Sequence, residues 1–336
     1  MKWYEKANHQ RETVVASRVR LVRNVKGHLF PNRLSEKERR TLREELQGAL
    51  SPLFPEDGYT YLQTEILSER ERRALRERRL INSTLAGHED PMGLFVSDDD
   101  EKSILLCGDD HLRLQNTLPG TALLPAWEEL SRLDDAIGEV LPYAFDEKYG
   151  YLTAFPTNVG TGLRATEVLH LPALSQDKSF RRLTSEMNRF GIMVRPVYGE
   201  GADAMGALYE ISNQKTLGLS EAEIIGTVQR MAGQMATQEN KLRKALREKG
   251  GASREDQAYK AYGVLRYARI LTCKEAMTYL SCVRAAVADG YLTLREPVNM
   301  YGLMLKVQED ALPQMGGKTP EEMRAILVRT ALPDLE

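Results

Sequence analysis

Five arginines of the first two-thirds of the sequence lie on or beside predicted strands, or where a strand is expected to lead into a helix. They are Arg18, Arg20, Arg113, Arg164 and Arg195. A cluster of guanidinium groups can hold a polyphosphate and neutralise charge on a phosphoryl group in transfer. Two carboxylates at strand ends, Asp109 and Glu200, could orient or deprotonate the acceptor. Together these residue types indicate phosphoryl transfer without a P-loop.

Arg18 and Arg20 lie in a predicted strand over residues 14–23. Their spacing of two places both side chains on one face of that strand. Two arginines on one face repel each other unless an anion or a carboxylate lies between them. The alternative is a solvated edge strand, where basic side chains discourage aggregation.

The loop over residues 155–164, Phe-Pro-Thr-Asn-Val-Gly-Thr-Gly-Leu-Arg, could also bind an anion. Glycine tolerates positive φ and lets backbone N–H groups approach an anion closely. We expect a helix to begin at Arg164 and to add its positive N-terminal end. The alternative is an ordinary turn, since the loop is neither a Walker sequence nor a dinucleotide fingerprint.

The segment Cys-Gly-Asp-Asp-His-Leu-Arg over residues 107–113 follows an apolar predicted strand. Loops at strand ends often carry catalytic groups. Alternatively, Asp109 or Asp110 caps a helix that begins at His111. Both interpretations can hold, one for each aspartate.

Composition narrows the class of protein. The chain has 336 residues, 42% of them hydrophobic and 28% charged, which suits a globular chain of two domains. The net charge of −2 gives no basic field for nucleic acid. The three cysteines lack CxxC spacing, and the acidic turn at 98–101 lacks the rest of a calcium loop, so we expect no protein-held metal. With no signal peptide and no apolar run of membrane-spanning length, we expect a cytoplasmic protein.

The pattern of the chain changes near residue 218. Strands and helices alternate before it, including a charged helix over 69–79 whose charges we expect to face solvent. Helical patterns follow, with capping boxes at Ser220/Glu223, Thr272/Glu275 and Thr319/Glu322 and a break at Gly250-Gly251. We expect a mixed domain over 1–218 and a helical domain over 219–336, with the apolar stripe from Ile224 to Met235 inside the helical domain's core.

Four segments resemble the phosphagen (guanidino) kinase family in order and approximate spacing. They are Ser-Arg-Val-Arg at 17–20, Asp-His-Leu-Arg at 110–113, Pro-Thr-Asn-Val-Gly-Thr-Gly-Leu-Arg at 156–164 and Ile-Ser-Asn at 211–213. Tyr-Gly-Glu-Gly at 198–201, Tyr-Gly-Val-Leu at 262–265 and the layout resemble its bacterial branch, which phosphorylates arginines in proteins. Phosphagen kinases carry a helical domain before the catalytic domain, whereas here a helical domain follows.

The resemblance implies an α+β fold, an antiparallel sheet flanked by helices, followed by an all-helical C-terminal domain. It also implies ATP with Mg²⁺, its phosphates gripped by the five arginines, and catalytic roles for Asp109 and Glu200. Asp109 stands where the family has a longer Glu, and Phe155, on the substrate side, stands where the family has a Cys. Of the segment that reads phosphoarginine in the bacterial branch, only Arg324 has a counterpart, which argues against feedback by phosphoarginine.

The leading hypothesis is an ATP-dependent protein arginine kinase whose partners are proteins with exposed arginines, a Clp-type ATPase and an activator protein, with a homodimer as one assembly. Without the helical domain that precedes the catalytic domain in phosphagen kinases, the acceptor side is expected to be open, which suits a protein substrate better than free arginine. The changes at Asp109 and Phe155 motivate an alternative, a weak or inactive nucleotide-binding homologue that acts as a protease adaptor. A third hypothesis is a small-molecule guanidino kinase. None of these involves nucleic acid or a membrane.

Overall fold

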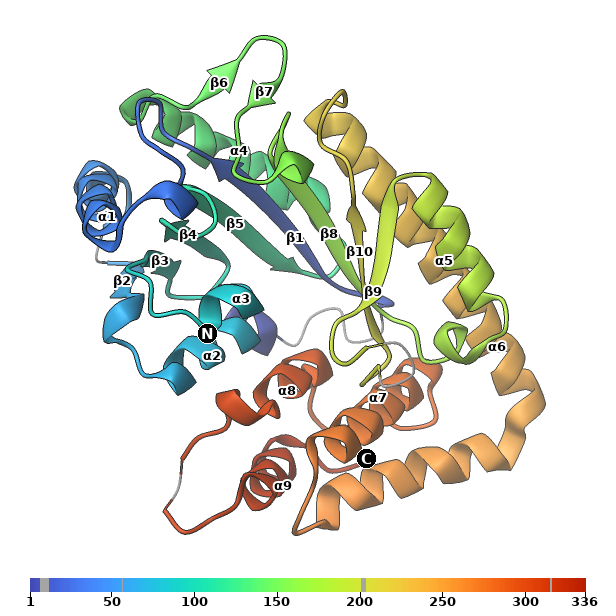
Figure 1. The fold of residues 1–336 in the computed structure, drawn as a ribbon. Helices are drawn as coiled ribbons and strands as arrows, with labels where there is room; N and C mark the ends of the chain where they lie inside the picture. The colour runs from blue at the N-terminus through green and yellow to red at the C-terminus, as the bar shows by residue number, and fades with distance from the viewer. Residues whose placement is uncertain (7–11, 56, 201–203, 315) are drawn as a thin grey trace.

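An eight-stranded antiparallel sheet forms the centre of the computed structural model, which describes residues 1–6, 12–55, 57–200, 204–314 and 316–336 (Figure 1). The strand order is β2-β3-β4-β5-β1-β8-β10-β9. The strands are β1 (Val14–Arg23), β2 (Tyr59–Gln63), β3 (Gly93–Ser97), β4 (Lys102–Leu106), β5 (Leu112–Pro119), β8 (Leu163–His170), β9 (Ile192–Pro196) and β10 (Leu208–Asn213). A separate hairpin pairs β6 (Phe145–Asp146) with β7 (Gly150–Tyr151). The antiparallel sheet expected from the family resemblance is confirmed.

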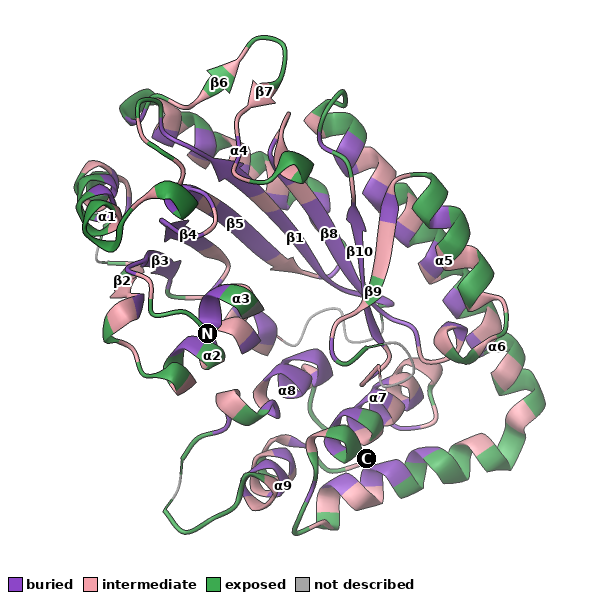
Figure 2. Ribbon diagram, in the orientation of Figure 1, coloured by how far each residue is buried: buried purple, intermediate pink, exposed green. Residues whose placement is uncertain are grey.

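The strand that carries Arg18 and Arg20 lies in the middle of the sheet. β1 pairs with β5 on one side and with β8 on the other, and nearly all of its residues are buried, as the purple central strands in Figure 2 show. The edge-strand alternative is therefore wrong. Both arginines lie on one face, as their spacing predicts, but inside the molecule.

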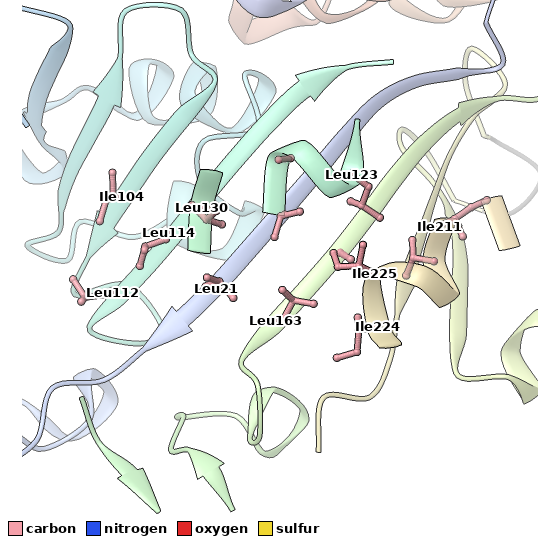
Figure 3. Packing of buried hydrophobic residues seen from close by; sticks show 14 of the residues in the cluster. Leu21, Ile104, Leu112, Leu114, Leu123, Leu130, Leu163, Ile211, Ile224 and Ile225 are labelled. Atoms are coloured by element: carbon pink, nitrogen blue, oxygen red, sulfur yellow. The ribbon is translucent and has the colours of Figure 1, made fainter. Parts of the chain in front are cut away.

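One face of the sheet packs against helices to form the main hydrophobic core. The helices are α1 (Glu36–Leu50), α4 (Leu123–Val140), α5 (Phe180–Arg189) and the first half of α6 (Glu221–Tyr267). Figure 3 shows Leu21, Leu114 and Leu163 of the sheet beside Leu130 of α4 and Ile225 of α6. Burial of this apolar area is the main force that holds the helices to the sheet.

The other face of the sheet packs less extensively, against α2 (Glu69–Glu77) and α3 (Ser83–Ala86) near β3 and β4. Period-two alternation separates the faces: Ile104 and Leu106 join the main core, whereas Leu105 joins the α2–α3 cluster. Leu105 is paired with Arg113, which places Arg113 on the α2–α3 face as well. We call this side the arginine face.

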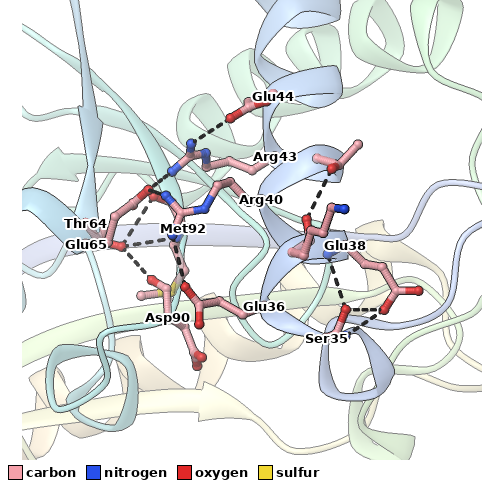
Figure 4. Close-up of polar contacts among 12 residues, drawn as sticks. Ser35, Glu36, Glu38, Arg40, Arg43, Glu44, Thr64, Glu65, Asp90 and Met92 are labelled. Carbon is pink, nitrogen blue, oxygen red and sulfur yellow. Dashed lines mark hydrogen bonds and ion pairs between the residues drawn. The ribbon is translucent and has the colours of Figure 1, made fainter.

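Polar contacts fix the start and the flank of α1 (Figure 4). Ser35 forms a capping box at the start of the helix, with its amide donating to Glu38 Oε2 at 2.8 Å. Arg43 on the buried side of the helix forms an ion pair with Glu65, in the turn that follows β2. The capping boxes predicted at Ser220, Thr272 and Thr319 are also present.

Two predicted helices are strands. Residues 163–170 form β8 between β1 and β10, and residues 112–119 form β5 between β4 and β1. Asp110 caps no helix, because its Oδ1 accepts hydrogen bonds at 2.7 Å from both Asn24 Nδ2 and the Ala154 amide. The glycine loop therefore leads into a strand, and Arg164 lies in β8 instead of at the start of a helix.

The remaining helices form a second hydrophobic core around α7 (Cys273–Asp289), α8 (Met300–Lys306) and α9 (Pro320–Ala331). The short helix α8 is not predicted from the sequence. No helix of the described part of the chain is long and apolar enough to cross a membrane.

The helix α6 contributes to both cores. Its residues Ile224, Val228 and Met235 pack in the sheet core, so the expectation that this stripe lies in the helical domain's core is wrong. Ala258 and Leu265 pack in the helical core. Gly251 interrupts the helix between these two groups, with φ 40° and ψ −135°. The domain division after residue 218 stays a prediction, and this packing favours a division at the Gly251 kink instead.

Candidate active site

Two adjoining cavities lie on the arginine face, with volumes of about 800 Å³ and about 240 Å³. Three side chains line both of them: Arg20, Asn82 and Arg113. Every predicted site residue except Arg324 lines at least one of the two. The larger cavity contains Arg18, Arg195 and Glu200, and the smaller one contains Asp109, Phe155 and Arg164.

The larger cavity carries an excess of positive charge. Its walls hold six arginines, Arg18, Arg20, Arg76, Arg79, Arg113 and Arg195, and three glutamates, Glu77, Glu200 and Glu210. The Nε atoms of Arg18, Arg20, Arg79 and Arg113 are buried and have no hydrogen-bond partner within the described ranges. Buried donors without partners are costly, so this wall is suited to an anion that brings several acceptor oxygens.

Glu210 of β10 neutralises part of this charge. Its Oε1 accepts from Arg18 Nη2 at 2.8 Å, and its Oε2 accepts from Arg195 Nε at 2.9 Å and Nη2 at 2.8 Å. Burial alone would raise the pKa of Glu210, but the charges of Arg18, Arg79 and Arg195 hold that pKa far below its usual value. Glu210 is therefore ionised and keeps two arginines aimed along the cavity wall.

Among the described residues, no carboxylate forms an ion pair with Arg20 or Arg113 as Glu210 does with Arg18 and Arg195. Burial, followed by the charges of Arg18, Arg113 and Arg164, lowers the pKa of Arg20 well below its usual value. Burial and the charge of Arg18 lower the pKa of Arg113 to about 10, although Asp109 acts in the opposite direction. Both shifts show that burial and neighbouring cations outweigh the nearby carboxylates Glu210 and Asp109, and a bound phosphate would add counter-charge.

The smaller cavity combines carboxylate, aromatic and cationic side chains. Asp109 is partly exposed, and Phe155 is 50% exposed despite its size. Arg164 donates to the Asn213 carbonyl at 3.1 Å, which places its guanidinium between β8 and β10. An acceptor guanidinium in this cavity would meet a carboxylate and a ring face, both of which attract a cation.

The glycine loop shapes the smaller cavity through its backbone conformation. Gly160 and Gly162 have φ values of 110° and 65°, in the region that favours glycine. A Cβ at Gly162 would lie 2.6 Å from the Val22 carbonyl oxygen, so the loop approaches β1 too closely for any other residue. Thr157, Asn158 and Gly162 line the cavity directly.

Asp110 lies beside Asp109 but is buried, at 2% exposure. Burial, with a smaller contribution from Asp109, raises the pKa of its carboxyl group. Asp110 is among the residues that line the smaller cavity, but its Oδ2 is buried and has no partner in the part of the chain that the structure describes. Among those residues, no group of three or more His, Cys, Asp and Glu side chains gathers in a way that could hold a metal ion by itself.

Sequence reasoning missed the turn between α2 and α3, whose charges were expected to face solvent. Arg79 adopts a left-handed φ of 65°, unusual for a residue with a Cβ, and its guanidinium lies 4.7 Å from the ring centre of Tyr198. Asn82 donates from Nδ2 to Asp109 Oδ2 at 2.9 Å. The only sequence signal was the position of these residues just after a helix rich in arginine.

Arg324 lines neither cavity and is buried in α9 at 2% exposure. Its Nε donates to the Val307 carbonyl at 2.7 Å and its Nη1 donates to the Leu271 carbonyl at 2.8 Å. These bonds tie α9 to α8 and to the start of α7. This geometry is that of a structural arginine.

Comparisons with known proteins agree with this geometry. Residues 41–242 match the family model of the ATP:guanido phosphotransferase C-terminal catalytic domain. The duplicated taurocyamine kinase of Schistosoma mansoni superposes on 71% of the chain with a TM-score of 0.61 and 25% identity, and this chain spans 34% of that protein. A lombricine kinase superposes on 69% of the chain and 67% of its own with a TM-score of 0.60 and 23% identity, which supports the fold. The chain belongs to the ATP:guanido phosphotransferase family.

Within that family the branch is also defined. Residues 252–336 match the C-terminal domain of the protein-arginine kinase McsB. The protein-arginine kinase of Desulforamulus reducens is 36% identical over 99% of this chain and 96% of its own, and that of Moorella thermoacetica is 39% identical over 98% and 97%. The chain is thus a member of the McsB branch, as its motifs indicated. The two family models leave residues 243–251 unmatched, and this gap ends at the Gly251 kink.

Proposed function

We propose that this protein transfers the γ-phosphoryl group of ATP to arginine side chains of protein substrates. The observation that carries the proposal is the junction of two cavities, one rich in unpartnered arginine donors and one that holds a carboxylate and an exposed ring. The shared wall of Arg20, Asn82 and Arg113 is where a phosphoryl group would pass from one cavity to the other.

In this proposal the arginine-rich cavity holds the polyphosphate. Arg18 and Arg195, fixed by Glu210, would contact phosphate oxygens from one side, and Arg20 and Arg113 of the shared wall would contact them from the other. Arg164 would reach the transferring phosphoryl group from the smaller cavity. Clustered guanidinium groups stabilise the charge that develops on a transferring phosphoryl group. The oxygen of the leaving β-phosphate takes the electron pair of the broken P–O bond, and these cations offset its charge.

The acceptor arginine would enter through the smaller cavity. Asp109 would orient its guanidinium, and Glu200 at the edge of the larger cavity would contact it from the opposite side. A guanidinium nitrogen forms the new N–P bond and loses one proton, which a neighbouring carboxylate can accept. Phe155 would offer its ring face to the cationic acceptor.

Mg²⁺ would accompany the nucleotide and supply charge neutralisation on the phosphates. Mg²⁺ in such sites keeps several waters and is bound through phosphates with one or two carboxylates. Asp109 fits that mode, because it is partly exposed and lines the smaller cavity beside the shared wall. This carboxylate would hold the ion through its waters.

Three features of the wider system remain proposals as well. Protein substrates marked by phosphoarginine would pass to a Clp-type ATPase, an activator protein would control the kinase, and the helical domain would provide a dimer contact. The branch to which the chain belongs supports substrates that are proteins. A cytoplasmic location fits these partners.

Two residues favour a second candidate, a nucleotide-binding adaptor with little or no transferase activity. The ring of Phe155 cannot act as a thiolate, and Asp109 reaches about one bond length less far than a glutamate. A misplacement of about 1 Å can cost on the order of 100-fold in rate. Such a protein would bind ATP and substrates without turnover.

The discriminating experiment is incubation with γ-labelled ATP and an unfolded, arginine-rich protein. Acid-labile label on arginine is expected in the native protein, and at least 100-fold less in Asp109→Asn, about the size of a lost catalytic carboxylate. Free arginine serves as a parallel acceptor and should stay unlabelled. ATP binding without any label, in both the native protein and the variant, would establish the adaptor instead.

A further inference from the structure

Asn82 occupies the boundary between the two cavities, where it lines both. It is also the N-cap residue of α3, with its Oδ1 accepting from the Leu85 amide at 2.8 Å. A backbone N–H can only donate, so this contact fixes which end of the side-chain amide is oxygen. The nitrogen Nδ2 must therefore point the other way, toward Asp109.

The contact of Asn82 with Asp109 is short and direct. Nδ2 donates to Oδ2 of Asp109 at 2.9 Å. The two residues are 27 positions apart in the chain, on different elements. Only Oδ2 of Asp109 takes part in this bond, so one oxygen is anchored and Oδ1 can face an acceptor guanidinium. A hydrogen bond to an ionised group is among the stronger ones and selects one carboxylate orientation.

The turn that carries Asn82 is itself fixed to the strand that follows Asp109. Arg113 Nη2 donates to the Leu80 carbonyl at 2.7 Å, and Gln115 Nε2 donates to the Arg79 carbonyl at 2.9 Å. Both donors come from β5. The turn and the strand therefore hold each other at two further points, and Asn82 has a fixed base from which to orient Asp109.

We propose that Asn82 is a positioning residue that orients the carboxylate of Asp109 toward the acceptor guanidinium. The proposal rests on the proposed function, in which Asp109 contacts the acceptor. An aspartate reaches less far and has fewer torsions than a glutamate, so its useful orientations are few. A single donor on one oxygen is enough to select among them.

The test uses Asn82→Ser, because serine caps a helix about as well as asparagine but has no amide donor. The melting temperature should stay within experimental error of the native value, since the cap remains. The KM for ATP should stay within about twofold of the native value, since the arginines remain. The kcat for arginine phosphorylation should fall about 10- to 100-fold, the range expected when a reacting group is displaced by about 1 Å. Asn82→Asp keeps a cap too, but opposes Asp109 with a like charge, so its kcat should be lower still.

Asn299 provides a matched control within the same chain. It is the N-cap of α8, with Oδ1 accepting from the Gly302 amide at 2.9 Å and Nδ2 donating to the Lys6 carbonyl at 2.7 Å. Asn299→Ser makes the same chemical change at a cap that lies outside both cavities. Its kcat should equal that of the native protein.

Crystal structures of the native protein and of Asn82→Ser supply a readout that does not depend on activity. Asp109 should occupy one rotamer in the native protein and more than one in the variant. An unchanged Asp109 rotamer, or a kcat within twofold of the native value in an active enzyme, would overturn the role of Asn82. Failure of the native protein to label arginine would instead refute the proposed function, and the rotamer comparison would still decide the role of Asn82.

Discussion

Arg20 of β1 lies directly opposite Arg164 of β8 in the antiparallel ladder. Like charges opposite each other destabilise a sheet, and here both guanidinium groups also lie near Arg18. Burial, Arg195 and Arg18 lower the pKa of Arg164, as burial and neighbouring cations do for Arg20. The pair is therefore unfavourable for the fold alone, and a bound polyphosphate would remove the repulsion.

The first prediction follows from this pair. Arg20→Met removes a buried cation and keeps a side chain of similar length. Replacing buried charges by apolar groups is often neutral or stabilising, by about 1–4 kcal/mol. The free energy of unfolding without ligand should therefore stay unchanged or rise by that amount, and the increase in melting temperature on adding ATP should disappear.

Denaturant unfolding and thermal melts with and without ATP measure both effects. Arg182→Met is the control, since the side chain of Arg182 is 80% exposed and lies outside the cavities. A variant at Arg20 that is less stable than the native protein and still responds to ATP would contradict the prediction.

The second prediction concerns Glu210, the carboxylate that holds Arg18 and Arg195. Glu210 is only 3% exposed. The Glu210→Gln change therefore leaves these cations without a counter-charge at a buried position. Breaking a buried ion pair in this way costs about 3–5 kcal/mol. Urea unfolding should show a loss of this size, and added tripolyphosphate should restore part of it.

A matched change is Glu186→Gln, in an exposed pair with Arg182 one helical turn away. Surface pairs of this kind contribute little, within about 1 kcal/mol. Equal losses in the free energy of unfolding for the two variants would show that Glu210 contributes no more to stability than an exposed ion pair does.

The third prediction uses Glu167, which lies in β8 on the side of the main core, at 1% exposure. Burial raises the pKa of Glu167 to about 7, against a small opposite effect of Ser17. The folded protein thus keeps this proton up to about pH 7, whereas the unfolded chain loses it near pH 4.5. Since the unfolded state then binds fewer protons, the free energy of unfolding should fall as pH rises through this window.

Glu167→Gln should remove this decrease in the free energy of unfolding, which amounts to roughly 3 kcal/mol once Glu167 is fully ionised. Unfolding curves at pH 5 and pH 8 provide the measurement: the variant should match the native protein at pH 5 and exceed it at pH 8. If the difference between the two proteins is the same at both pH values, Glu167 is not titrating in this range.

The fourth prediction concerns Phe155, half-exposed at the smaller cavity. The free energy of unfolding of Phe155→Ala should lie within about 0.5 kcal/mol of the native value, as is usual for substitutions at the surface. Loss of a cation–π contact of about 0.5–1 kcal/mol should raise the KM for a protein acceptor about two- to fivefold. Phe155→Tyr keeps the ring face and should restore the native KM.

Steady-state kinetics with ATP saturating and the protein acceptor varied would measure this effect. The KM for ATP should not change in either variant, because the ring lines only the cavity without Arg18 and Arg195. An Ala variant with native KM for the acceptor would remove Phe155 from the acceptor site.

Much of the site could be predicted from the sequence because its parts are local. The spacing of Arg18 and Arg20 places both on one face of any strand, whatever the strand's neighbours are. The capping boxes at Ser220, Thr272 and Thr319 mark helix starts through contacts only three residues long.

The two mistaken helices had a physical cause. β5 and β8 are largely buried on both faces, so their apolar residues do not alternate cleanly with polar ones. A helix start also suits the residues before them, since β8 follows Gly162 and β5 begins two residues after Asp110. Their strand character comes from hydrogen bonds to β1, β4 and β10, distant in sequence.

The sequence by itself thus determined the residue types, their faces on single strands and the family to which the chain belongs. Only the tertiary structure decided which of these residues meet. The order β5-β1-β8-β10-β9 brings Arg113, Arg20 and Arg164 to one wall and sets Glu210 between Arg18 and Arg195. The contact of Asn82 with Asp109 depends on how the α2–α3 turn packs on β5. Strand order and turn packing are set by burial of apolar surface over the whole chain, which no local pattern specifies.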